Sequence, residues 1–277
     1  MTIAQIIKAL EDRHVKLPPE EKSCDGVIYG DISKECSGIV LTCCATASVL
    51  KEAAALGCNL VISHEPTFYH GCDDRGWLKG TEIYETKVEL LRAHGIVVYR
   101  DHDRVHRENR DMIYTGIIKR LGWEKYALGE DFFPVSGYEL PEMTLEELGK
   151  EVSSKLQLDG IRFIGDPKMK VKKAALTAHF FGGTEDEKTI LEIENNNYDV
   201  VIPLETVDWT IITYILDSCA LGRPKALLNV GHFNLEEPGM EMLKPWLFEI
   251  VGNIIPIHFI PAGNFYHWLE SGKKNGY

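Results

Sequence analysis

The segment Asn59–Phe68, with the sequence Asn-Leu-Val-Ile-Ser-His-Glu-Pro-Thr-Phe, indicates both the fold and a candidate site. A short run of apolar and small residues leads directly into His64 and Glu65, and Pro66 ends it. This pattern is typical of a buried strand in an open α/β sheet, where ligands bind at the carboxyl ends of strands. Adjacent strand residues point to opposite sides, so His64 and Glu65 can serve two neighbouring metal ions. The alternative is a loop histidine beside a solvated glutamate.

The segments around this strand predict an alternation of strands and helices. Gly38–Cys44 reads as a strand, Thr46–Leu56 as an alanine-rich helix, and Leu60–Ser63 as the next strand. We expect these two strands to be parallel with a right-handed crossover. A helix over Thr81–His94 and a strand over Ile96–Tyr99 continue the pattern.

The fold class that we expect is α/β, with two lobes that each contain a mostly parallel sheet flanked by helices. The 277 residues suffice for two such lobes. Residues 1–126 together with 227–277 are predicted to form the metal-binding lobe, and residues 127–226 a second lobe inserted into it. Thr144 and Glu147 form a capping-box pattern near the start of the second lobe. Near the end of the chain, Pro238 fits the first turn of a helix that is predicted to run over about 239–251.

Composition excludes several classes of function. The formal net charge of -12 disfavours binding to nucleic acids or anionic membranes. No apolar run reaches the ~18 residues of a membrane span, and the N-terminal residues show an amphipathic pattern in place of a signal peptide. Seven cysteines without a CxxC pair indicate a reduced chain, so we expect a cytoplasmic protein. A thiol-based redox protein is a minor alternative, and it requires Cys43 or Cys44 to be exposed with a depressed pKa.

Three predicted strand ends carry a histidine with a second potential ligand nearby: His64 with Glu65, His102 with His106, and His232 with Glu236. The carboxyl ends of parallel strands lie at one edge of a sheet, so these loops can converge. The spacing of four residues in the second and third pairs places both side chains on one face of a helical turn. Histidine with carboxylate and no thiolate suits Zn, Fe, Mn or Co at a catalytic site. The alternative is three unrelated surface histidines.

These segments resemble the GTP cyclohydrolase I type 2 homologue family, whose members are also called NIF-three-like dinuclear-metal-centre hexameric proteins. The resemblance rests on Leu60–Pro66, on Val98 and Tyr99 followed by His102 and His106, and on Val230–His232 followed by Glu236. Cys24–Gly30 also resembles the Trp-Asp-Asn-x-Gly-Leu stretch of the family, with Asp25 retained. The resemblance covers nearly the whole chain and matches the short form of the family.

Two positions depart from the family pattern, and the changes compensate each other. Members of the family carry His-His where this chain has His64 and Glu65, and an aspartate where it has His106. The resemblance implies two divalent transition metal ions, Zn, Fe, Mn or Co. It implies these ligands: His64, Glu65, His106, His232 and Glu236. Glu236 would bridge the ions, and His102 is the candidate catalytic residue.

The resemblance implies a metal-dependent hydrolase with a dinuclear centre, acting on a nucleotide-like or other small phosphorylated substrate. It also implies a homohexamer. The alternative is a non-enzymatic metal-binding scaffold or regulatory protein. The two differ in coordination, because a hydrolase requires an open position at the metal and a structural site is closed. Glu205 stands where the family has the glutamate of Thr-Gly-Glu, and it is either a substrate contact or a solvated carboxylate.

Overall fold

The computed structural model describes residues 1–18, 20–130 and 132–269. The chain divides into two compact units. The first unit comprises Met1–Lys119 and Glu236–Ala262, and the second comprises Arg120–Leu235 and the described residues 263–269. The second unit is therefore inserted into the first, as expected from the sequence. No described helix combines the length and the apolar character that a membrane crossing requires.

The first unit is built on a five-stranded sheet within the described residues, with the order β1-β4-β3-β2-β10. Its strands are β1 (Gly26–Tyr29), β2 (Ile39–Cys44), β3 (Leu60–Glu65), β4 (Val97–Arg100) and β10 (Ile257–Phe259). All neighbouring pairs are parallel except β1 with β4. The predicted β2–helix–β3 unit is confirmed, with Ile39 paired to Leu60. β3 lies in the middle of the sheet, so the residues at its carboxyl end are surrounded by two neighbouring strand ends.

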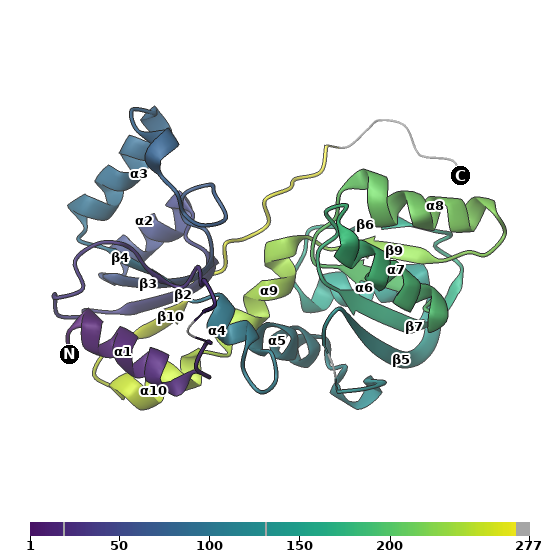
Figure 1. The fold of residues 1–277 in the computed structure, drawn as a ribbon, viewed down its shortest axis with the longest axis horizontal. Coiled ribbons are helices and arrows are strands. Elements are labelled where there is room, and N and C mark those ends of the chain that lie inside the picture. Colours follow the sequence, from purple (N-terminus) through teal and green to yellow (C-terminus); the bar gives the residue numbers. More distant parts are fainter. Residues whose placement is uncertain (19, 131, 270–277) are drawn as a thin grey trace. The chain divides into compact units, whose positions relative to one another are not determined.

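Several helices belong wholly or partly to the first unit, and four of them cover the two faces of this sheet (Figure 1). Those belonging wholly or partly to this unit are α1 (Ile3–Arg13), α2 (Ala47–Ala55), α3 (Glu82–Ala93), α4 (Asp103–His106), α5 (Met112–Leu121), α9 (His232–Glu241) and α10 (Lys244–Val251), with a short 3-10 turn over Gly76–Leu78. α2 and α3 lie on one face of the sheet, and α1 and α10 on the other (Figure 1). The apolar side chains between α2, α3 and the sheet form one continuous core, which includes Val49, Val61 and Leu91.

The helix that carries Glu236 departs from the sequence expectation. We predicted a single helix that begins near Pro238, whereas α9 begins at His232 and contains Pro238 in its interior. A proline inside a helix removes one hydrogen bond and disturbs the preceding turn. Consistent with this, α9 ends at Glu241, three residues later, and α10 begins separately at Lys244.

α5 and α9 cross at a point where neither helix has a side chain. A Cβ atom added to Gly116 would lie 2.4 Å from the Cα atom of Gly239, and one added to Gly239 would lie 2.4 Å from the Cα atom of Ile113. No real Cβ contact is this short, so both positions require glycine for the observed approach. The position of α9 in the first unit therefore depends on direct contact between two backbones.

The second unit contains another five-stranded sheet among the described residues, with the order β5-β7-β8-β9-β6. Its strands are β5 (Val135–Thr144), β6 (Arg162–Ile164), β7 (Lys170–Thr177), β8 (Val200–Pro203) and β9 (Ala226–Asn229). β7, β8 and β9 are parallel, while the edge strands β5 and β6 are antiparallel to their neighbours. The predicted boundary at residue 227 needs correction, because β9 pairs in this second sheet. An apolar run such as Ala226–Leu228 fits the interior of either sheet, so its own sequence does not assign it.

The helices of the second unit are α6 (Leu145–Lys155), α7 (Thr184–Asn195) and α8 (Thr213–Ala220), with short helical turns over Glu124–Tyr126 and Asp208–Ile212. Residues of α7 and α8 share a core with Val201 and Leu227. Leu228 points to the opposite face, where it approaches Gly149 of α6. The predicted capping box is confirmed: Thr144 Oγ1 accepts from the backbone of Glu147, whose carboxylate accepts from the backbone of Thr144.

Candidate metal centre

His64 and Glu65 occupy the last two positions of β3, and both are buried, with exposed fractions of 0% and 8%. His64 Nδ1 lies 3.2 Å from the backbone carbonyl of Asp101. A carbonyl oxygen only accepts hydrogen bonds, so Nδ1 carries the proton. The neutral ring then has an unprotonated Nε2, which is the form that ligates a metal ion.

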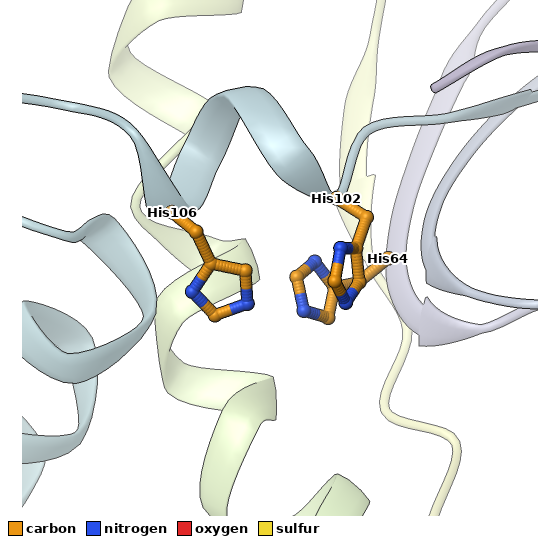
Figure 2. A group of neighbouring side chains, drawn as sticks. All are labelled: His64, His102 and His106. Carbon is orange, nitrogen blue, oxygen red and sulfur yellow. The ribbon is translucent and has the colours of Figure 1, made fainter. Parts of the chain in front are cut away.

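His102 and His106 join His64 at the carboxyl end of the neighbouring strand. His102 follows β4 and precedes α4, and His106 is the last residue of this single-turn helix. The ring centroids of His64 and His102 are 4.4 Å apart, and that of His106 lies 5.0 and 4.9 Å from them. The three rings converge on one point (Figure 2), with one potential ligand nitrogen from each within 4.8 Å of the others.

A carboxylate lies within hydrogen-bond distance of the Nδ1 atom of each of the two histidines, His102 before α4 and His106 at its end. His102 Nδ1 lies 2.9 Å from Asp103 Oδ1, and His106 Nδ1 lies 2.8 Å from Asp111 Oδ2. Such contacts fix the ring orientation of metal-binding histidines. Burial by itself lowers the pKa of His106, but Asp111 and the nearby Glu236 and Glu65 carboxylates outweigh it and raise this pKa overall.

α4 itself is positioned by Asp25, a residue that the sequence analysis noted only for its resemblance to a family stretch. Asp25 Oδ1 accepts from the backbone nitrogens of His102 and Asp103 at 2.7 and 2.8 Å, and Oδ2 accepts from Arg104 at 3.0 Å. A carboxylate in this position satisfies the free N–H groups at the start of a helix. Asp25 therefore sets the backbone from which the two histidines project.

Two carboxylates, those of Glu65 and Glu236, lie near the His64 imidazole. Glu236 of α9 is 0% exposed, and its Oε2 lies 3.5 Å from His64 Nε2. One ligand atom each from His64, Glu65 and Glu236 lie within 4.8 Å of one another. Arg100 Nη2 lies 3.8 Å from Glu65 Oε2, and Arg100 Nε donates to the carbonyl of His64 at 2.9 Å. A buried group with two carboxylates favours the presence of a cation.

His14 contacts the site through Asp101, although no spacing in the sequence identifies His14 as a site residue. It follows α1 and is buried, with Nε2 3.0 Å from Asp101 Oδ2 and Nδ1 2.8 Å from Glu108 Oε1. Burial disfavours the charged ring, but the two carboxylates outweigh this effect and raise the pKa of His14. The side chain of Asp101 is thus held by His14, while its backbone carbonyl accepts a hydrogen bond from His64 Nδ1.

Cys43 and Cys44 lack the properties of a redox centre. Cys43 is buried with its Sγ 3.9 Å from Glu236 Oε2, and burial raises its pKa well above the ordinary value. Burial also raises the pKa of Cys44 to about 11. Cys24 forms a further potential ligand group with His102 and Asp103, but burial raises the pKa of this thiol to about 12. The redox alternative required an exposed thiol of depressed pKa at Cys43 or Cys44, and neither has one.

His232, the remaining predicted ligand, is the first residue of α9 and belongs to the second unit. There its Nε2 lies 3.1 Å from His179 Nε2, and its Nδ1 lies 3.3 Å from Glu205 Oε2. His179 was not singled out by the sequence analysis, because it follows β7 without a second ligand type at a regular spacing. Within the first unit, the structure gathers His64, Glu65, His102, His106 and Glu236.

The donor set of the first unit suits a transition metal. It consists of three imidazoles and two carboxylates and includes no thiolate of low pKa. This combination is typical of Zn, Fe, Mn or Co at catalytic centres and differs from the all-oxygen sites of Ca²⁺. The residues present therefore fit a metal ion of this class.

Known proteins provide an independent comparison. The model of the family Duf34/NIF3 (NGG1p interacting factor 3) matches residues 1–262. The chain belongs to this family. A "GTP cyclohydrolase 1 type 2 homolog" of Clostridium perfringens is 26% identical over 254 residues, 86% of this chain and 88% of the relative. A protein of the same name from Clostridium acetobutylicum is 23% identical over 226 residues, 79% of each chain.

Solved structures share the Duf34/NIF3 fold. The Staphylococcus aureus protein SA1388 has a TM-score of 0.69 at 20% identity, with 97% of this chain and 99% of that chain covered. A Bacillus cereus protein related to NIF3 has the same TM-score and coverage at 14% identity. At these identities the likeness establishes the two-unit α/β fold and leaves the chemistry of this member to its own residues.

Proposed function

We propose that this Duf34/NIF3 protein is a metal-dependent hydrolase with a dinuclear centre, acting on a nucleotide-like or other small phosphorylated substrate. The observation that carries the proposal is the convergence of His64, His106, Glu65 and Glu236 at the carboxyl edge of the first sheet. Each of these side chains comes from a segment that is fixed by hydrogen bonds or by burial. Burying carboxylates and imidazoles together destabilises the folded state unless a bound cation compensates their charge.

We assign five ligands: His64, Glu65, His106, His232 and Glu236. Glu236 would contribute a carboxylate to both ions, and His232 is included because it stands four residues earlier on α9, on the same helix face. Two divalent ions at these ligands supply Lewis acidity, which lowers the pKa of water and polarises the substrate. The family resemblance further suggests that six chains assemble into a homohexamer.

Charge explains how an acidic chain can attract an anionic substrate. The two glutamates contribute -2 and two divalent ions contribute +4, so the centre has a net charge of about +2. The positive charge of Arg100, beside Glu65, is offset by the Asp73 carboxylate 3.7 Å from its Nη1. The net positive charge of the centre opposes the formal net charge of -12 and concentrates anions at the site.

His102 is the residue that we assign to proton transfer. Asp103 holds the proton on Nδ1, so Nε2 can accept one from the attacking water and return it to the leaving group. The His102 side chain is 27% exposed, which leaves it accessible to a substrate. Asp103, whose pKa is lowered by its hydrogen bond to His102, remains ionised in this role.

A metal-binding scaffold without catalysis is the second candidate. It is favoured by the complete burial of His64 and Glu236, which is typical of a closed structural site. A scaffold requires metal for stability and has no need of His102 for proton transfer. The two candidates therefore differ in the phenotype of a His102 variant.

Metal content tests the ligand assignment first. We expect about two transition ions per chain in wild type, and at least one fewer in His106→Ala and Glu236→Gln. His94→Ala is the matched control, because His94 is an exposed histidine of the first unit. Unchanged metal content in both ligand variants would contradict the assignment.

Hydrolysis tests the activity. GTP is the first substrate to try, because two relatives are named GTP cyclohydrolase 1 type 2 homologs, followed by other nucleotides and phosphate esters. We expect His102→Asn to retain metal and to lose about 10²–10⁴-fold in kcat, the usual contribution of a general acid–base group. Full metal loading without turnover of any of these compounds would favour the scaffold.

A further inference from the structure

The second unit contains two adjoining cavities at the carboxyl ends of β8 and β9. Their volumes are about 240 and 190 Å³. Six residues line both cavities: Arg162, Asn229, Gly231, Asn234, Phe265 and Tyr266. Ligands of open α/β sheets bind at this edge, and ligand pockets are typically apolar with a few polar groups. The position and the lining are those of a small-molecule site.

Arg162 supplies the positive charge of these cavities. It begins the edge strand β6 and is paired in register with Asn229, the last residue of β9. Within the described part of the chain, its guanidinium has neither an acidic partner nor a hydrogen-bond acceptor. Its planar fork matches the oxygens of a phosphate or carboxylate.

An aromatic wall faces the same space. Phe265, Tyr266 and Trp268 lie on the segment that follows the last strand of the chain, and Tyr266 is 79% exposed. A Cβ atom on Gly160 would lie 2.4 Å from Trp268 Nε1, so the indole is in direct contact with the glycine backbone. Exposed aromatic rings lining a cavity favour a planar ligand that stacks on them.

Two asparagines hold this segment against the second unit. Asn234 Nδ2 donates to Asn264 Oδ1 at 3.1 Å, and Asn264 Nδ2 donates to the carbonyl of Gln157 at 3.3 Å. Phe265 also meets Phe233 edge to face, with ring centroids 5.1 Å apart. The aromatic wall is therefore a built part of the second unit.

In addition to Arg162, each cavity has one acidic residue in its lining: Asp159 in the first cavity and Glu205 in the second. The side chain of Glu205 is 48% exposed, and its Oε2 lies near His232 Nδ1. A carboxylate accepts hydrogen bonds and repels anions, so it suits the N–H groups of a ring. The anionic end of a ligand is expected at Arg162, and its ring with N–H donors toward Glu205.

We propose that this pocket binds a planar nitrogen heterocycle that bears an anionic group, with a purine nucleoside monophosphate as the representative ligand. The ring stacks on the aromatic wall, and the phosphate pairs with Arg162. Because the proposal depends only on residues of the second unit, it holds whether or not the metal centre of the first unit is catalytic.

Isothermal titration calorimetry on the full chain, in the presence of chelator, tests the proposal with GMP, AMP, guanosine and ribose 5-phosphate as probes. GMP is expected to bind more tightly than AMP, because guanine presents ring N–H donors to Glu205. Guanosine and ribose 5-phosphate, which each lack one half of the ligand, are expected to bind at least tenfold more weakly than GMP.

Variants locate the binding. Arg162→Gln should weaken GMP at least tenfold and leave guanosine unchanged, whereas Tyr266→Ala should weaken both. Arg223→Gln, at an exposed arginine outside the cavities, should change neither. Glu236→Gln should also leave GMP binding intact, which separates this pocket from the metal centre. The proposal is overturned if GMP does not bind, or if Arg162→Gln leaves its affinity unchanged.

Discussion

Replacing Glu236 by glutamine should have opposite effects on the metal-free and metal-loaded protein. One oxygen each of Glu65 and Glu236 lie within 4.8 Å, and both side chains are buried. Two like charges at this separation repel by about 3.5 kcal/mol at an effective dielectric constant of about 20. Arg100 offsets part of this repulsion from its place beside Glu65. Without metal, we therefore expect Glu236→Gln to raise the free energy of unfolding by about 1–3 kcal/mol.

The sign reverses when metal is present. Wild type then gains the binding free energy of its ions, while the glutamine variant has lost a charged ligand and binds them weakly. Urea denaturation at neutral pH, with chelator and separately with saturating Zn²⁺ or Mn²⁺, measures both effects. Glu52→Gln on α2 is the control, because it removes one negative charge from an exposed position of the same unit.

The reasoning is refuted if Glu236→Gln destabilises the metal-free protein as much as the metal-loaded one. In that case the carboxylate would be stabilised by neighbours within the protein, and the argument that the cluster favours a cation would fail. A stabilisation of similar size in Glu52→Gln would instead show that the general negative charge of the chain is responsible.

Three further predictions concern single residues. Thr144→Ala removes the cap of α6 and should lower the free energy of unfolding by about 1 kcal/mol in chemical denaturation, with no loss of metal. Burial lowers the pKa of Lys87, so at pH values just below the ordinary pKa of 10.5 the folded protein binds fewer protons than the unfolded chain. The free energy of unfolding should therefore rise with pH in this range. Urea midpoints measured across this pH range should show the rise in wild type and lack it in Lys87→Met. In thiol labelling of the native protein, exposed Cys72 should react first, whereas Cys43 and Cys44 should react only after unfolding.

The first sheet was largely predictable because its signals are local. Leu60–Ser63 is a short apolar run, the preceding helix has a threonine cap, and a βαβ unit has one common handedness. The location of β9 was not predictable in this way. Ala226–Asn229 is placed in the second sheet by its pairing with β8 on one side and β6 on the other, and such pairing depends on residues distant in sequence.

The candidate site likewise has residues that local spacing predicts and residues that only long-range contacts reveal. His64, Glu65, His106 and Glu236 were grouped from their spacing and their positions after strands, and the structure places them together in the first unit. The residues that orient them were not recognised. Asp103, Asp111 and Arg100 act through contacts with neighbouring side chains and backbone, and such contacts have no recurring spacing in a sequence.

The crossing of α5 and α9 has a consequence for how mutations of this protein will be interpreted. Gly116 and Gly239 have no functional group, yet any side chain at either position would push apart the helix that carries Glu236 and its neighbour. A saturation screen scored by metal-dependent growth or turnover would rank both glycines with the ligands themselves. Attempts to stabilise the protein by replacing helical glycines with alanine, a common engineering strategy, should therefore leave these two positions unchanged.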